Sequence, residues 1–247
     1  MKKIFAFLIL ITAVSTCPRA ATQSIVCSDS ASQPIDTVAV ADGDTVGTAS
    51  LYGNGQNYVT DVKVTVRFEN HEPYDIELDD GYSPSISAFD FGAENKLLFC
   101  SSQTGGSSGY GNYRVYSLKT DSYMLLYDDK TDSRNSAFGA EFIPNGFMRL
   151  RNDGTGYELD VYVGYMDRTF YDMIFSPDGG VKNEQPYVND ISFVSPALNP
   201  ASGIYRLTTY RSVTAVAEVN RLGYIVRTLD FENGGFVPTF TEFSISL

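Results

Sequence analysis

The chain has 247 residues, enough for one sizeable hydrophobic core or two small ones, and its formal net charge is −12. No basic run interrupts this acidic character, which argues against nucleic acid or anionic lipid as a partner. The sequence has 17 Tyr, 16 Phe and 21 Gly but no Trp, a composition typical of strands joined by tight turns.

The N-terminal residues have the pattern of a secretory signal. Lys2 and Lys3 precede an apolar run from Ile4 to Val14, which is shorter than the roughly 20 residues that a membrane-spanning helix needs. We therefore expect a signal peptide over residues 1–21 and a secreted or cell-surface protein, with a buried N-terminal helix or strand as the alternative. Lipidation at Cys17 would instead make the chain a lipoprotein, held at the membrane by an N-terminal lipid. Ordinary cleavage is favoured, because Thr16 and Pro18 fit the lipoprotein pattern poorly.

Two further cysteines, Cys27 and Cys100, would enter an oxidising compartment, where thiols tend to pair. A disulfide between them would tie the N-terminal lead-in to the second cluster of strands. The alternative is two buried free thiols. Because the sequence has no Cys-x-x-Cys spacing, nothing supports a zinc or redox site.

After a polar, flexible lead-in at residues 22–35, alternation of apolar and polar residues dominates to the end of the chain, and we expect one domain over residues 36–247. The first clear strand is "DVKVTVRF" (61–68), whose valines and Phe68 share one face. Hairpins are predicted from residues 113–118 with 122–128, from 157–165 with 168–176, and from 221–231 with 235–247. The last of these turns through "ENGG" (232–235), where glycine supplies the positive φ of a tight turn.

No segment shows sustained helical spacing with caps; "SVTAVAEVNRL" (212–222) is the one candidate, and a strand or bend fits it equally well. The fold class is therefore all-β. About sixteen short strands fit into clusters roughly 45–50 residues apart, which suggests a β-propeller-like array of about four to five antiparallel blades. A pair of β-sandwiches produces the same count, so periodicity leaves both architectures open.

Three stretches carry a family resemblance. They are "ADGDTVGTASLYGNG" (41–55), "IELDDGYSPSISAFDF" (76–91) followed by "SSQTGGSSGYGNYRVYSL" (101–118), and "SGIYRLTTYRSV" (202–213) continuing to "LGYIVRTLDFENGGFVPTF" (222–240). In order and spacing they resemble the VCBS/FG-GAP repeat-containing proteins that Gram-positive, spore-forming bacteria export. The blades of that superfamily are similar to those of the integrin α-subunit head. The resemblance implies a repeat-built, propeller-like fold outside the cell with no assigned catalytic activity.

The loop at residues 42–47 partly matches the pattern of a calcium-binding loop. Asp42, Asp44 and Gly47 occupy positions one, three and six of an Asp-rich calcium loop, but Val46 stands at position five, where an oxygen ligand is expected. A second acidic loop offers Asp90 with an irregular spacing. We interpret both as degraded calcium loops and expect no cofactor. The alternative is a weak cation site formed by Asp42, Asp44 and Asp90.

The sequence gives little support for catalysis. His71 is the only histidine and lies in a polar turn, so a Ser-His-Asp triad has no basis. Glycoside hydrolysis needs only two carboxylates, and Asp79/Asp80 and Asp128/Asp129 are the candidate pairs. The Gly/Ser-rich segment 101–112 instead suggests a loop that presents Tyr110 and Tyr113 to a ligand. We therefore predict a non-catalytic surface or extracellular protein that binds an unknown protein or carbohydrate; the alternative is an extracellular polysaccharide hydrolase.

Overall fold

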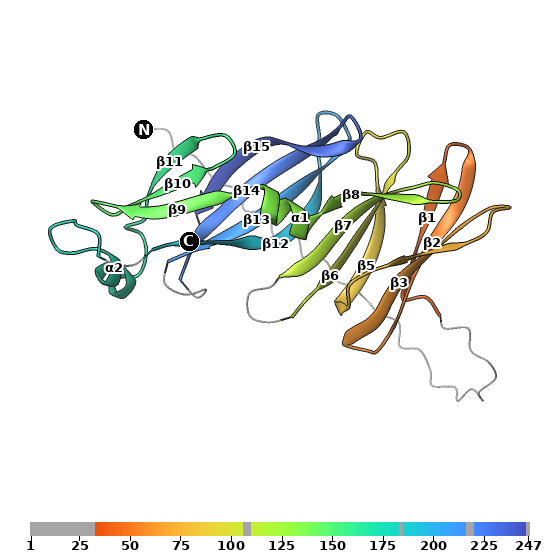
Figure 1. The fold of residues 1–247 in the computed structure, drawn as a ribbon, viewed down its shortest axis with the longest axis horizontal. Coiled ribbons are helices and arrows are strands. Elements are labelled where there is room, and N and C mark those ends of the chain that lie inside the picture. The colour runs from red at the N-terminus through yellow and green to blue at the C-terminus, as the bar shows by residue number, and fades with distance from the viewer. Residues whose placement is uncertain (1–32, 106–109, 183–184, 216–219, 246–247) are drawn as a thin grey trace, which may run out of the picture. The chain divides into compact units, whose positions relative to one another are not determined.

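Residues 33–105, 110–182, 185–215 and 220–245 are described by a computed structural model of the chain (Figure 1). In these ranges the chain forms fifteen strands and two short helices, which confirms the all-β prediction. The compact unit begins at Gln33, close to the predicted start at residue 36. The predicted signal peptide, Cys17 and Cys27 lie outside the described residues. No helix in the described part is both long and apolar enough to cross a membrane.

The first sheet has eight antiparallel strands in the order β1-β2-β3-β5-β6-β7-β8, with β4 also paired to β3. Its strands are β1 (Asp36–Asp42), β2 (Thr45–Asn54), β3 (Tyr58–Phe68), β4 (Tyr74–Glu77), β5 (Gly81–Phe89), β6 (Leu97–Gln103), β7 (Gly111–Leu118) and β8 (Tyr123–Asp128). β3 joins the sheet together: Tyr58 and Val59 pair with β5, whereas residues 63–66 pair with β4. The two N-terminal strand clusters, which suggested separate blades, thus form one continuous sheet.

The alternation predicted in β3 is confirmed. Val62, Val64, Val66 and Phe68 are all buried, with exposures of 2% or less, while the intervening side chains are exposed or half-buried. The predicted hairpin between β7 and β8 is also present, and Lys119 N donates to Ser122 O across its turn at 2.8 Å.

The second sheet has three strands in the order β11-β10-β9, namely β9 (Phe138–Ile143), β10 (Phe147–Asn152) and β11 (Tyr157–Tyr162). The prediction that residues 157–165 form a hairpin with 168–176 is wrong. β11 pairs with β10, and the second segment forms helix α2 (Arg168–Ile174). Asp167 caps this helix by accepting from Thr169 N, and Ile174 on the helix is buried. The cap and the buried apolar side chain stabilise a helix here, although the alternation of residues also fits a strand.

The third sheet has the order β12-β13-β14-β15, with β12 (Tyr187–Leu198), β13 (Tyr205–Thr214), β14 (Arg221–Glu232) and β15 (Gly235–Ile245). The predicted hairpin through "ENGG" is confirmed as the β14–β15 turn. Asn233 and Gly234 both have positive φ, 51° and 84°, as a two-residue hairpin turn requires.

Three apolar clusters hold the sheets together. The first lies within the eight-stranded sheet, the second joins that sheet to the third sheet, and the third joins the second sheet to the third. β6 contributes to two of them, because Leu98 and Cys100 belong to the first cluster whereas Leu97 and Phe99 belong to the second. The strand is therefore buried on both faces, and a single sheet serves two cores.

Candidate functional site

The candidate site is built around a short helix that sequence patterns did not predict, α1 (Asp129–Asn135), which directly follows β8. Asp128 is its N-cap: its backbone is extended, and its Oδ2 accepts from Thr131 N at 3.2 Å and from Thr131 Oγ1 at 2.7 Å. A capping carboxylate satisfies backbone donors that the first helical turn leaves free. This local hydrogen bonding ends β8 and turns the chain into α1.

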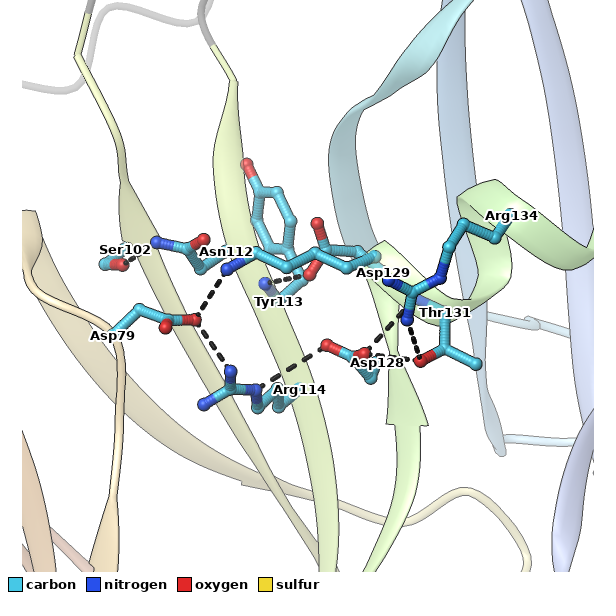
Figure 2. A network of polar contacts seen from close by, with 10 residues as sticks. Asp79, Ser102, Asn112, Tyr113, Arg114, Asp128, Asp129, Thr131 and Arg134 are labelled. Atoms are coloured by element: carbon cyan, nitrogen blue, oxygen red, sulfur yellow. Dashed lines mark hydrogen bonds and ion pairs between the residues drawn. The ribbon is translucent and has the colours of Figure 1, made fainter.

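Asp128 also belongs to a network of charged side chains (Figure 2). Arg114, on β7, lies between Asp79 and Asp128: its Nη2 is 2.7 Å from Asp79 Oδ2, and its Nε is 3.6 Å from Asp128 Oδ1. Lys130 contacts the same Asp79 oxygen at 3.0 Å. The 3.6 Å separation exceeds hydrogen-bond length, and the buried Oδ1 of Asp128 has no hydrogen-bond partner among the described residues. This oxygen therefore retains the capacity to accept a hydrogen bond.

The next residue, Asp129, anchors α1 to the first sheet. Asp129 is 4% exposed, and its Oδ1 accepts from Tyr113 N at 2.8 Å; Figure 2 shows this contact. Burial raises the pKa of Asp129 to about 6, with the neighbouring Asp128 adding to the rise and the Tyr113 hydrogen bond opposing it. A carboxyl group with such a pKa resembles a general acid, but Asp129 does not line the cleft described below.

Two buried arginines of the third sheet hold the other end of α1. Arg211 donates to the carbonyl oxygens of Ser133 and Ser136, where α1 ends and its backbone acceptors are free. Arg227 forms an ion pair with Asp132 at 2.9 Å, and both arginines are less than 10% exposed. Burial lowers the pKa of Arg211. Tyr127 OH donates to the same Asp132 carboxylate at 3.3 Å, so this carboxylate is held from two sides.

A cleft of about 280 Å³ opens between β8, α1, β14 and β15, and we call it the α1 cleft. Its polar lining consists of Asp128, Thr131, Asp132, Asn135 and Arg227. Its apolar lining consists of Leu125, Leu126, Tyr127, Leu229, Phe236 and Pro238. The cleft thus offers hydrogen-bond donors and acceptors together with an apolar wall that includes aromatic rings.

The carboxylates of the α1 cleft are poorly arranged for glycoside hydrolysis. That reaction uses two carboxyl groups that flank the scissile bond, one of them protonated or nucleophilic. Asp128 and Asp132 instead lie one helical turn apart at the same segment, and Asp132 is neutralised by Arg227. The remaining candidates, Asp79 and Asp80, are not part of the cleft lining. The arrangement suits hydrogen bonding to a bound ligand better than acid–base chemistry.

The predicted calcium ligands are not brought together. Asp42 accepts from Lys119 Nζ at 3.1 Å and from Thr120 N at 3.0 Å, Asp44 is exposed at the β1–β2 turn, and Asp90 accepts from Gly92 N. Burial raises the pKa of Asp42, but the hydrogen bonds from Lys119 and Thr120 outweigh it and leave that pKa below its usual value. No group of three or more His, Cys, Asp or Glu side chains in the described ranges is placed to hold a metal ion.

The two tyrosines that were predicted to bind a ligand, Tyr110 and Tyr113, have different surroundings. Tyr113 is 4% exposed and packs against Phe99 in the second apolar cluster and against the exposed Phe193, and burial raises its pKa to about 12. It is a core residue: together with Val115 on the same strand, it belongs to the apolar cluster that joins the first and third sheets. Tyr110 is half-buried and immediately precedes β7, and its carbonyl oxygen accepts from Thr104 N. The α1 cleft contains neither of them.

Among the described residues Cys100 forms no disulfide; it is 3% exposed, and burial raises the pKa of its thiol to about 12. Its predicted disulfide partner, Cys27, lies outside the described residues.

Sequence reasoning missed Asp132, Asn135, Arg227 and Phe236. The first two follow the N-cap residue Asp128, but α1 contains no apolar residue and has Thr131 where a capping box has Glu or Gln, so the sequence signal for this helix is weak. Arg227 and Phe236 carry no local signal, because 95 residues separate Arg227 from Asp132.

Part of the chain is similar to a known protein family. Residues 137–244 match the YybI C-terminal domain family. The match covers the second and third sheets, α2 and less than half of the chain. No curated protein matches the chain, and no solved structure does.

Proposed function

We propose that this chain is an exported, non-catalytic binding protein whose α1 cleft takes a neutral carbohydrate. The observation that carries the proposal is the two-sided lining of the cleft. Asp128, Asn135 and Arg227 provide planar polar groups, and Phe236 with Leu229 provides an apolar surface.

Sugar rings require both kinds of contact. Each hydroxyl group both donates and accepts hydrogen bonds, and carboxylates, amides and guanidinium groups are its complementary partners. The C–H faces of the ring are apolar and stack on aromatic or aliphatic side chains, a contact that Phe236 offers in place of Trp. A net charge of −12 disfavours acidic polysaccharides at long range, so the neutral ligand is favoured.

The polar groups are also held in place before a ligand arrives. Arg227 is 6% exposed and is fixed by Asp132, while Asp132 is fixed in turn by Tyr127. A site whose side chains are already ordered loses little conformational entropy on binding.

Export of the protein is supported by the sequence pattern of residues 1–21 and by the resemblance to exported repeat proteins. Hydrolysis, the alternative, is disfavoured because the two carboxylates of the cleft belong to one helical segment.

Calorimetric titration of the mature protein with cello-, xylo- and malto-oligosaccharides tests the proposal, with polygalacturonate as the anionic comparison. We expect at least one neutral oligosaccharide to bind and Asn135→Ala to weaken it about tenfold, since that loss corresponds to roughly 1.4 kcal/mol. Asn57→Ala, at an exposed bend outside the cleft, is the matched control and should bind normally. Binding of polygalacturonate alone, or release of new reducing ends, would contradict the proposal.

A further inference from the structure

A second hollow, of about 290 Å³, lies between the second and third sheets, and we call it the edge groove. Buried or partly buried apolar side chains from four strands line it: Phe138, Leu150, Ile225 and Phe243. Polar or more exposed residues complete the lining: Arg151, Asn152, Thr155, Tyr157, Leu159, Thr241 and Glu242. The groove falls within the residues that match the YybI C-terminal domain and shares no lining residue with the α1 cleft.

Two sheet edges border this groove. β11 is the terminal strand of the second sheet, and β15 is the terminal strand of the third sheet. Within the described residues β11 pairs only with β10, and β15 pairs only with β14. A terminal strand presents unpaired backbone N–H and C=O groups, which readily pair with an added strand. Both strands that border the edge groove therefore carry main-chain groups with which an added strand can pair.

The exposure of β11 is unusual for a strand next to an apolar hollow. Tyr157 is 65% exposed and Leu159 is 36% exposed, and both line the groove. Their spacing of two residues matches the period of a strand, so they point to the same face. Proteins normally cover such side chains or replace them by charge, which indicates an interaction surface.

The charges around the edge groove indicate the kind of partner. Arg149 and Arg151 are already paired with Asp160 and Asp153, at 2.7 and 2.8 Å. Glu242 lines the groove and has no ion pair with any described residue. Together with the net charge of −12, this unneutralised carboxylate favours a basic partner.

We propose that the edge groove binds an extended segment of a partner protein in which apolar and basic residues alternate. The backbone of the segment pairs with the edges of β11 and β15. Its apolar side chains, two residues apart, pack on Leu150 and Ile225 in the groove, and its basic side chains face Glu242 and solvent. This is strand addition, in which main-chain bonds supply affinity and alternate side chains supply specificity.

The experiment measures fluorescence anisotropy of a labelled peptide of alternating valine and lysine titrated with the mature protein. A block peptide of the same composition, with the valines grouped and the lysines grouped, controls for charge attraction alone. A third peptide carries N-methyl groups at alternate positions, which removes backbone donors without changing charge. We expect the alternating peptide to bind, and the other two to bind at least about tenfold more weakly.

Two single substitutions test whether the alternating peptide binds in the edge groove. Tyr157→Ala on β11 should weaken the alternating peptide about tenfold, as truncation of an aromatic contact residue commonly does. Tyr187→Ala, on β12 at the opposite edge of the third sheet and 59% exposed, should leave the affinity unchanged. Both sites are exposed, so both variants are expected to fold.

Three results would overturn the proposal. The first is equal affinity for the alternating and block peptides. The second is an equal loss of affinity for the alternating peptide in Tyr157→Ala and Tyr187→Ala. The third is that none of the three peptides binds. Self-association of the protein that Tyr157→Ala abolishes, without peptide binding, would assign the groove to a second copy of this chain instead. The peptide titration tests the edge groove, whereas Asn135→Ala and the oligosaccharide titration test the α1 cleft. Either proposal can therefore fail without the other.

Discussion

The residues that line the α1 cleft and those that line the edge groove differ in what they contribute to the fold. In the cleft, the groups that would touch a ligand also hold the fold: Asp128 caps α1, and Arg227 neutralises the half-buried carboxylate of Asp132. In the groove, Tyr157 and Leu159 are exposed and contribute little to the core. We therefore expect substitutions in the cleft to change affinity and stability together, and substitutions in the groove to change them separately.

The largest effect is expected at Arg227. Arg227→Met removes the cation that faces Asp132 and leaves this carboxylate, 14% exposed, without an ion-pair partner. Breaking a buried pair from one side lowers the free energy of unfolding by about 3–5 kcal/mol, measured here by urea denaturation. Arg206→Met, which breaks the more exposed pair with Asp230, is the control and should cost less than about 1 kcal/mol. Equal losses would show that the cleft pair has no structural role.

Asp129 provides a pH-dependent comparison. Its folded pKa of about 6 lies above the ordinary value of 3.8, so the folded state binds the proton more tightly than the unfolded state. The stability that this group contributes is complete below about pH 4 and is lost as the pH rises through 6. Asp129→Asn keeps the acceptor for Tyr113 N and should stabilise the protein at pH 7.5 by up to about 3 kcal/mol, but not at pH 4. Denaturation midpoints of both proteins across this range provide the measurement; a difference that does not vary with pH would contradict it.

Removing the helix cap should have a moderate effect. Asp128→Ala is expected to lower the free energy of unfolding by about 1 kcal/mol and also to weaken oligosaccharide binding, because the same side chain caps α1 and lines the cleft. Asp167→Ala removes the cap of α2 and should cost a similar amount of stability without affecting the ligand. Thermal melts and calorimetric titration of the two variants distinguish a lost cap from a lost contact.

The smallest effect on stability is expected in the groove. Leu159→Ser should change the free energy of unfolding by no more than about 0.5 kcal/mol, because this side chain is 36% exposed. The same substitution should weaken the alternating valine–lysine peptide, whereas Leu198→Ser on β12 should not. A large loss of stability in Leu159→Ser would remove the contrast between the two sites.

Local patterns predicted local structure well and spatial partners poorly. The alternation in β3 and the turn at Asn233 and Gly234 depend on neighbours in the chain, and both are confirmed. α2 was mistaken for a strand because "RTFYDMIFS" satisfies either period, and only the cap at Asp167 with the buried Ile174 decides between them. Both proposed sites escaped prediction, since each combines segments that are far apart in sequence, as Asp132 and Arg227 are.

Because β6 is buried on both faces, chemical labelling of Cys100 can measure how often the first sheet separates from its packing. Its thiol is shielded by one core while its neighbours Leu97 and Phe99 belong to another, and its raised pKa keeps the reactive thiolate scarce. An alkylating reagent can therefore modify Cys100 only in molecules whose first sheet has separated from its packing. The rate at which the peptide containing Cys100 becomes labelled would measure how often the interior opens under native conditions.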